Sequence, residues 1–249
     1  MIEVRPVPGL GEIADGDDLA AILAAAVVPL WPERGDCLVV TQKVVSKAEG
    51  RWVALAEVTP SARAREIADA IGKDPRVVEV VLSESTQVLR ATRGVLIVRH
   101  RSGLVMANAG IDGSNVGPGT GERVLLLPRD PDGSAEAIAD GIEGRLGLAL
   151  GVVVSDSFGR PWREGVVNVA IGCARIPALH DRRGELDRDG RTLQATLVAY
   201  GDLIASAAGL AMGEGAEGVP AALVRGLRLP GDPRPAATLI RPLEADLFQ

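Results

Sequence analysis

The feature of this sequence that most constrains its fold is an aliphatic run that stops at a polar cluster. Val152–Val154 has no polar alternation, and Ser155, Asp156 and Ser157 follow it directly. Such a run is typical of a strand that is buried on both faces, and this requires a sheet covered on its two sides. A carboxylate beyond a strand of this kind, on a turn that faces a crevice, stands where open α/β-type sheets bind ligands. The run therefore predicts a covered sheet with a binding crevice at Asp156.

The residues after the run allow two interpretations. Asp156 and Ser157 offer the hard oxygen ligands that Mg²⁺ or Mn²⁺ prefers, and Arg160 and Arg163 would then bind phosphate oxygens beside the metal. In the other interpretation Asp156 caps the next element and both arginines are solvated. This stretch alone does not separate a metal–phosphate site from an ordinary strand-to-helix turn.

Composition narrows the class of partner. The chain of 249 residues is long enough for one large domain or two closely joined ones. Aromatic residues make up only 2% of it and the net charge is −6, so a base-stacking platform or a general nucleic-acid surface is disfavoured. A single nucleotide held through a metal remains compatible, because the cation supplies the missing positive charge.

The expected compartment is a reducing one. Cys37 and Cys173 lie in or beside apolar runs and are interpreted as small buried hydrophobes. No charged-then-apolar leader opens the chain, and no apolar run reaches the ~18 residues that span a bilayer. We therefore expect a cytoplasmic protein without a membrane partner.

The local patterns predict a chain that mixes helices and strands. Strands are expected over residues 2–7, 37–41, 87–91, 95–99, 104–107, 124–127, 166–171 and 221–224. Helices are expected over residues 19–27, 60–71, 75–84, 134–146 and 194–212. Loops are expected at residues 42–50 and 155–157, and a charged hairpin tip at residues 182–191. His100 stands alone at an expected hairpin turn and is interpreted as structural.

Three polar segments interrupt the apolar structure, around Asp112, Asp156 and Glu214. Residues 108–119 contain four glycines, and there Asp112 is a candidate metal ligand and Asn115 a candidate base or phosphate contact, although a plain loop would look similar. Three carboxylates from distant segments are what a one- or two-metal phosphate site requires. Their convergence in space is a hypothesis.

Several familiar motifs are excluded by the residues around them or by missing partner residues. Residues 213–218 spell G-x-G-x-x-G, but they follow an expected helix and precede an expected strand, the reverse of a dinucleotide-binding turn. The P-loop pattern is absent, and Phe158 stands where an aspartyl-phosphate phosphatase needs its second acid. Neither cysteine has a metal-ligand or triad partner at the usual spacing.

Four blocks, in this order and spacing, carry a specific resemblance: TQKVVSKAEGR, NAGIDGSNV, VSDSFGRPWREG and MGEGAEGVPAALVRGL. Together they resemble the coenzyme F420-0:L-glutamate ligase family, over essentially residues 1–249 as a single stand-alone unit without a following flavin domain. The resemblance implies an unusual two-domain α+β fold with mixed and antiparallel sheets, forming an intertwined homodimer. It also implies a GTP-dependent ligase that joins L-glutamate to the lactyl carboxylate of F420-0, or of a dehydro or related precursor, through an acyl phosphate. It further implies the addition of γ-linked glutamates and a need for Mg²⁺ or Mn²⁺ (two ions), with K⁺ assisting.

The resemblance also assigns roles residue by residue. Metal ligands are Asp112, Asp156, Ser157 (where a threonine is more usual) and Glu214. Nucleotide contacts are Leu10, Gly11, Glu12, Ile13, Gln42, Lys43, Lys47, Asn115, Met212, Gly213, Glu214, Gly215, Ala216, Glu217, Gly218 and Val219. The phosphoryl-transfer chemistry then gives catalytic roles to Asp112, Asp156 and Lys47, and Arg160 or Arg163 is a further candidate from the residue pattern alone. The chain departs from the family pattern at Gln42, Lys43, Leu203 and residues 180–183.

Two other functions stay open at this point. The same fold could ligate an amino acid to a different phosphate-linked acid, or it could bind a nucleotide or deazaflavin without catalysis. The intact set of carboxylates disfavours the second, because binding alone does not need three metal ligands.

Overall fold

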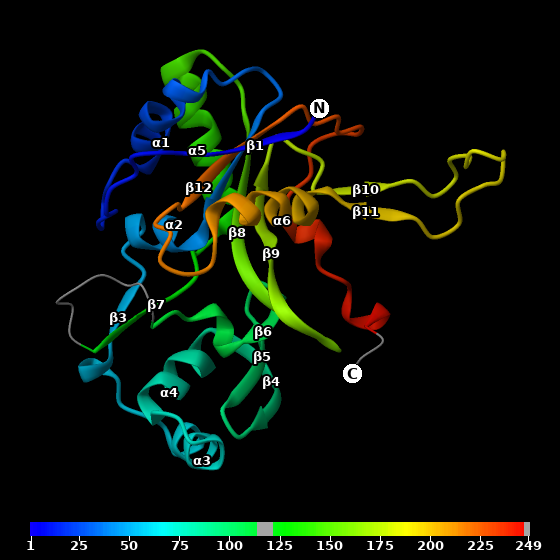
Figure 1. Ribbon diagram of the computed structural model, residues 1–249. Helices are drawn as coiled ribbons and strands as arrows, with labels where there is room; N and C mark the ends of the chain where they lie inside the picture. Colours follow the sequence, from blue (N-terminus) through cyan, green and yellow to red (C-terminus); the bar gives the residue numbers. More distant parts are fainter. Residues whose placement is uncertain (114–121, 247–249) are drawn as a thin grey trace.

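The computed structural model describes residues 1–113 and 122–246, and it confirms a mixture of helices with mixed and antiparallel sheets (Figure 1). The largest sheet among these residues has five strands in the order β1-β12-β2-β8-β9. They are β1 (Glu3–Pro6), β2 (Cys37–Thr41), β8 (Gly151–Arg160), β9 (Arg163–Ala174) and β12 (Ala221–Arg225). β2 and β8 run parallel, and every other neighbouring pair is antiparallel.

The central strands are buried on both faces, as the aliphatic runs predict. Leu38 of β2 and Val152 of β8 belong to one hydrophobic cluster, whereas their neighbours Val39 and Val153 belong to another on the opposite face. Helices α1 (Leu19–Val27) and α5 (Pro131–Leu146) cover the first face, and α6 (Tyr200–Met212) covers the second. The sheet is therefore the middle layer of a three-layer arrangement.

A second group of elements has its own hydrophobic clusters. Helices α3 (Ala62–Ile71) and α4 (Pro75–Ser83) pack on the antiparallel sheet of β4 (Ser85–Thr92), β5 (Val95–His100) and β6 (Val105–Ala107). The pair β3 (Trp52–Ala54) and β7 (Arg123–Leu125) lies beside α4 and connects this group to the main sheet. Figure 1 shows the long β8–β9 hairpin curving from the main sheet toward β6.

The remaining elements are short. β10 (Leu179–Asp181) pairs with β11 (Leu197–Ala199) at the base of a projecting excursion, visible at the right of Figure 1. Helix α2 (Gln42–Ala48) follows β2, and single-turn 3₁₀ helices occupy Val28–Leu30, Leu55–Glu57, Asn108–Gly110, Ala236–Leu239 and Leu243–Ala245. In the part of the chain that the structure covers, no helix combines the length and hydrophobicity needed to cross a bilayer.

Several expected boundaries are wrong: α3 begins at Ala62 rather than at residue 60, α5 begins at Pro131 rather than at residue 134, and three further differences have a clear tertiary cause. Residues 42–48 form a helix rather than a loop, because Val44 and Val45 are buried and the polar side chains between them bond within the protein. β8 continues through the expected turn at residues 155–157 to Arg160, because β9 pairs with it throughout after a bulge at Val154–Ser155. The helix expected over 194–212 begins only at Tyr200, because residues 197–199 pair with β10.

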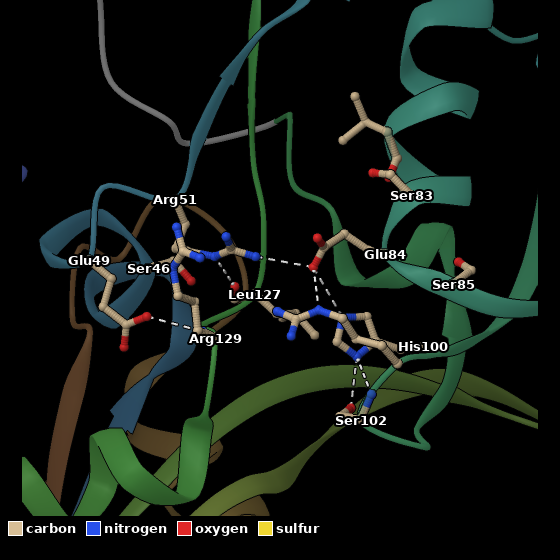
Figure 2. A network of polar contacts seen from close by, with 12 residues as sticks. Ser46, Glu49, Arg51, Ser83, Glu84, Ser85, His100, Ser102, Leu127 and Arg129 are labelled. Atoms are coloured by element: carbon tan, nitrogen blue, oxygen red, sulfur yellow. Dashed lines mark hydrogen bonds and ion pairs between the residues drawn. The ribbon is translucent and has the colours of Figure 1, made fainter. Parts of the chain in front are cut away.

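Glu84 holds the second group against the β3–β7 segment (Figure 2). Its Oε2 accepts hydrogen bonds from Arg51 Nη2 at 3.1 Å and Arg101 Nε at 3.0 Å, and His100 Nε2 lies 3.6 Å away. Arg51 also donates to the carbonyl of Leu127 at 2.9 Å. Burial alone would raise the pKa of Glu84, but Arg101 and Arg51 lower it overall. Burial lowers the pKa of His100, which stays neutral, in keeping with a structural role.

We expect Glu84→Gln to lower the free energy of unfolding by about 3 kcal/mol at pH 7, because Arg51 is left buried without its counter-charge. The pKa of Glu84 is lowered in the fold, so its contribution exists above its unfolded pKa and is lost as the pH falls through the folded pKa. Urea unfolding at several pH values should show the difference from wild type shrinking below about pH 4. Glu122→Gln, in an exposed ion pair with Arg76, should cost at most about 1 kcal/mol. Equal losses in both variants would contradict the assignment.

A close backbone approach joins α5 to β9. Asp132, in the first turn of α5, accepts hydrogen bonds from the Cys173 and Ala236 amides at 2.8 and 2.7 Å. Gly172, beside Cys173, lies so near that a Cβ there would overlap the Pro131 carbonyl. The missing side chain at residue 172 therefore allows α5 to sit on the sheet.

We expect Gly172→Ala to lower the free energy of unfolding by about 3 kcal/mol, because the clash is with backbone that cannot rotate away. Gly144→Ala is the matched control, because a Cβ there meets nothing within 4 Å on the exposed side of α5. It should raise stability by about 0.5–1 kcal/mol through helix propensity. Thermal unfolding of both variants checks the prediction, and a neutral Gly172→Ala would refute it.

Candidate functional site

A cavity of about 820 Å³ opens where β2 ends opposite Ser155, in the middle of β8. Segments from six separate parts of the chain line it: residues 10–13, the end of β2 with α2, Gly113, the middle of β8, Asn168 of β9, and the loop between α6 and β12. Its lining residues are Leu10, Gly11, Glu12, Ile13, Thr41, Lys43, Val44, Lys47, Gly113, Ser155, Asp156, Ser157, Asn168, Met212, Gly213, Glu214, Gly215, Ala216, Glu217, Gly218, Val219 and Pro220.

Asp156 is the carboxylate at the centre of this cavity. It lies within β8, opposite Val169 of β9, and not on the turn that its sequence context predicts. Burial, together with the negative charges of Asp112 and Glu214, raises its pKa to about 7, while the Ser157 amide and Lys43 partly oppose this rise. Asp156 therefore lies within electrostatic reach of the other two predicted metal carboxylates.

Asp112 is held by both its backbone and its side chain. Its amide and carbonyl each bond to Leu125 at 2.9 Å, as an isolated bridge beside β7. Its Oδ2 accepts a hydrogen bond from Gln42 Nε2 at 2.9 Å, and Lys43 Nζ lies 3.5 Å from the same oxygen. Burial raises the pKa of Asp112, and Lys43 and Gln42 partly oppose this rise.

A left-handed turn leads into Asp112. Asn108, Ala109 and Gly110 have φ values of 52°, 55° and 68°. Left-handed backbone is unfavourable for residues with a Cβ, so neighbouring contacts must hold this turn. Ala109 is 1% exposed, and Lys73 Nζ donates to Asn108 Oδ1 at 2.7 Å.

Glu214 enters the cavity from the glycine-rich loop after α6. Its Oε1 accepts a hydrogen bond from Asn168 Nδ2 of β9 at 2.7 Å. In the same loop, Glu217 Oε2 accepts from the Gly215 amide at 2.7 Å and lies against Gly213, whose φ is 74°. The loop follows a helix and precedes a strand, as the order of patterns predicts, so it is not a dinucleotide-binding turn.

Lys47 brings a nearly buried ammonium group to the cavity. It lies on α2 with 7% of its surface exposed, and its Nζ is 3.0 Å from Glu12 Oε2. Glu12 is largely exposed, at 78% of its side chain. The resulting ion pair has one buried partner and one exposed partner, so an incoming anion can replace Glu12 at Lys47.

The structure does not bring every predicted residue into the cavity. Asp112 is not among the lining residues, although its neighbour Gly113 is. Arg160 and Arg163 flank the turn of the β8–β9 hairpin and are not among the lining residues, and Arg160 Nη2 donates instead to the Glu164 carbonyl at 3.2 Å. Gln42 lies behind the wall with both ends of its amide bonded, to Asp112 and Ser46. Asn115 falls outside the described residues.

Other lining residues were not predicted from the sequence, notably Thr41, Ser155 and Asn168. Asn168 is a single polar residue in an otherwise apolar stretch of β9, and it pairs with Ser157 across the hairpin. Two polar residues directly opposite each other on paired strands at the predicted ligand edge indicate a site residue. This pairing can be recognised only once the register of β8 and β9 is known. Cys37 and Cys173 are buried and free, as expected, and burial raises the pKa of both thiols.

The donor chemistry suits a hard divalent cation. Among residues 1–113 and 122–246, no three His, Cys, Asp or Glu side chains come close enough together to hold an ion alone. Mg²⁺ typically uses one or two carboxylates and completes its shell with water and substrate phosphates, so a full protein cage is not required. Burial raises the pKa of both Asp156 and Asp112, and Asp112 and Glu214 add to the rise at Asp156, so a bound cation would stabilise these carboxylates in their charged form.

Comparison with known proteins gives a single consistent family. The F420-0:gamma-glutamyl ligase profile matches residues 9–226. A protein named coenzyme F420:L-glutamate ligase from Methanopyrus kandleri is 45% identical over 100% of this chain and 98% of its own length. Proteins of the same name from Methanothermobacter thermautotrophicus (43% identical, 100% of this chain and 99% of the relative) and Archaeoglobus fulgidus (46%, 93% and 90%) agree. The chain therefore belongs to the F420-0:gamma-glutamyl ligase family.

Proposed function

We propose that this protein is a GTP-dependent ligase that forms an amide between L-glutamate and the lactyl carboxylate of F420-0 or a closely related precursor. Family membership supports the ligase class, because the relatives carry the name coenzyme F420:L-glutamate ligase. The observation that carries the proposal is the cavity, which is lined by Asp156, Glu214 and a nearly buried lysine, with Asp112 close enough to help raise the pKa of Asp156. That combination suits a nucleoside triphosphate with its metals better than a neutral ligand.

The chemistry begins with a carboxylate that must become an electrophile. An oxygen of the acid substrate attacks the γ-phosphorus of GTP, the bond from that phosphorus to the bridging oxygen breaks, and GDP leaves. The glutamate nitrogen then attacks the carbonyl carbon of the acyl phosphate, a C–N bond forms, and inorganic phosphate leaves as the nitrogen loses its proton. Such transfers depend mainly on positioning and charge neutralisation.

The residues of this chain divide that task between them. A phosphate oxygen would displace Glu12 and bind Lys47 in its place. Because Lys47 is nearly buried, this contact would be stronger than one at the surface. The backbone amides of the loop over residues 213–218 would donate hydrogen bonds to the phosphates, since the glycines of this loop leave its backbone accessible. Residues 10–13 would close the opposite side of the nucleotide.

The metals belong to the proposal as Mg²⁺ or Mn²⁺, two per site, with K⁺ assisting. Asp112, Asp156, Ser157 and Glu214 would hold them together with phosphate oxygens. Divalent cations supply charge neutralisation at the transferring phosphoryl group. The proposal also includes the homodimer that the family resemblance implies, which analytical ultracentrifugation tests directly.

We expect Asp156→Asn to reduce GDP release by at least about 10³-fold, because a central metal carboxylate is lost. The fold should keep its stability, since a buried charge that two other carboxylates repel is removed. The assay combines GTP, Mn²⁺, L-glutamate and F420-0, measures GDP, and detects glutamylated products by mass spectrometry. Asp69→Asn, on the exposed side of α3, should behave as wild type.

Two wild-type outcomes would change the proposal. GTP turnover with another phosphate-linked acid but not with F420-0 would indicate a different ligase. Nucleotide binding without turnover on any such acid would indicate a binding protein, and unaltered turnover by Asp156→Asn would remove this residue from the mechanism.

Lys47→Met and Glu12→Gln should change GTP affinity in opposite directions. Loss of the lysine removes a charge-assisted contact and should weaken binding about 10- to 100-fold. Loss of the competing carboxylate frees Lys47 and should tighten binding, by about fivefold at most because Glu12 is exposed. Calorimetric titration with a non-hydrolysable GTP analogue at fixed Mg²⁺ measures both. Weaker binding by Glu12→Gln would mean that Glu12 itself contacts the nucleotide.

A further inference from the structure

Two side-chain amides stand directly behind two of the predicted metal carboxylates. Gln42 Nε2 is 2.9 Å from Asp112 Oδ2, and Asn168 Nδ2 is 2.7 Å from Glu214 Oε1. The amides come from different elements, α2 and β9, and the carboxylates from different loops. In each pair one carboxylate oxygen accepts the amide hydrogen bond and the other does not take part in it.

We propose that Gln42 and Asn168 are positioning residues, each holding one oxygen of a metal-binding carboxylate so that the other oxygen faces the cation. This inference rests on the proposed function, because it assigns a role toward the metals of that site. A terminal carboxylate torsion is broad and settles in one orientation only when a further contact fixes it. Hydrogen bonds to ligating carboxylates are the usual means of fixing them.

The Gln42 amide can have only one orientation. An ionised carboxylate accepts hydrogen bonds and cannot donate, so the NH₂ end must face Asp112. The oxygen end then accepts from Ser46 Oγ at 3.0 Å, one helical turn along α2. Gln42 is 1% exposed, so water cannot take the place of either partner. Both ends of its amide are thus used within the chain, which assigns Gln42 to Asp112 rather than to the nucleotide.

Asn168 depends on a missing side chain in α6. A Cβ at residue 209 would overlap Asn168 Oδ1, so Gly209 provides the space in which the amide lies. The strand is held there by Ser206, whose hydroxyl donates to the Asn168 carbonyl at 2.7 Å. The NH₂ end is thereby directed toward the glycine-rich loop, where it reaches Glu214. Unlike the Gln42 pair, this pair is exposed to solvent, so its contribution is expected to be the smaller one.

The test measures binding of Mn²⁺ alone to the purified full-length protein, from the electron paramagnetic resonance signal of the free ion. Gln42→Met keeps the length of the side chain and removes the amide, and it should raise the Kd for Mn²⁺ by about 10- to 100-fold. Asn168→Ala should raise it by about tenfold. Gln194→Met is the control of the same type, because Gln194 donates only to an exposed carbonyl in the β10–β11 excursion. Its Mn²⁺ affinity should equal that of wild type.

Gly209→Ala separates positioning from a general structural effect. Alanine is the better helix former, but its Cβ displaces the Asn168 amide, so Mn²⁺ binding should weaken about tenfold without a fall in thermal midpoint. In the Asn168→Ala background the same substitution should change nothing further, because no amide is left to displace. This cycle uses half-buried residues and keeps the proposal testable if Gln42→Met fails to fold.

The outcomes distinguish this inference from the function on which it rests. Wild-type protein that binds no Mn²⁺ would refute the metal part of the proposed function. Wild-type protein that binds Mn²⁺, with folded Gln42→Met and Asn168→Ala variants within about twofold of it, would refute only the positioning role. An equal effect of Gly209→Ala with and without Asn168 would refute the route through α6.

Discussion

The parallel pairing of β2 with β8 is the constraint on which the site depends. Thr41 lies opposite Ser155, so the residues that follow these two positions lie side by side in space. At this edge of the sheet β2 passes into α2, which carries both lysines of the cavity, while β8 presents Asp156. The Thr41 amide also donates to the Pro220 carbonyl at 2.9 Å, and this bond ties the loop after α6 to the same place. One register therefore gathers groups that are far apart in the sequence.

The carboxylates at this edge of the sheet do not stabilise the fold. Asp156 and Asp112 both have raised pKa values, because burial disfavours their charged forms and, for Asp156, the charges of Asp112 and Glu214 add to the effect. The aliphatic layers above and below the sheet, with Val39, Val153 and Leu223 wholly buried, offset this unfavourable charge. Instability confined to one edge of an otherwise well-packed sheet is the usual arrangement of a functional site.

The sequence predicts the parts of this protein whose signals are local. Helix α4 begins at the expected cap, Asp74, whereas α3 is capped by Ser61 rather than by the expected Thr59, and the buried runs form strands as their composition requires. The polar segments give a misleading pattern, because Ser155–Ser157 and residues 42–48 have the composition of loops but form a strand and a helix. Pairing with β9 and burial of α2 decide their conformation, and both are tertiary effects. For the same reason no local pattern reveals that Gln42 and Asn168 lie behind carboxylates.

The left-handed turn at Asn108–Gly110 has a consequence for the order in which the site assembles. Three successive residues in this conformation are unfavourable for an isolated chain, so the turn forms only when its surroundings hold it. Those surroundings are the Lys73 contact, the packing around Ala109 and the bridge from Asp112 to Leu125, all of which join distant segments. During folding, Asp112 therefore reaches its place after the second group of elements and β7 have come together. A chain that is only partly folded would have Asp156 on its strand but would lack the carboxylate that faces it.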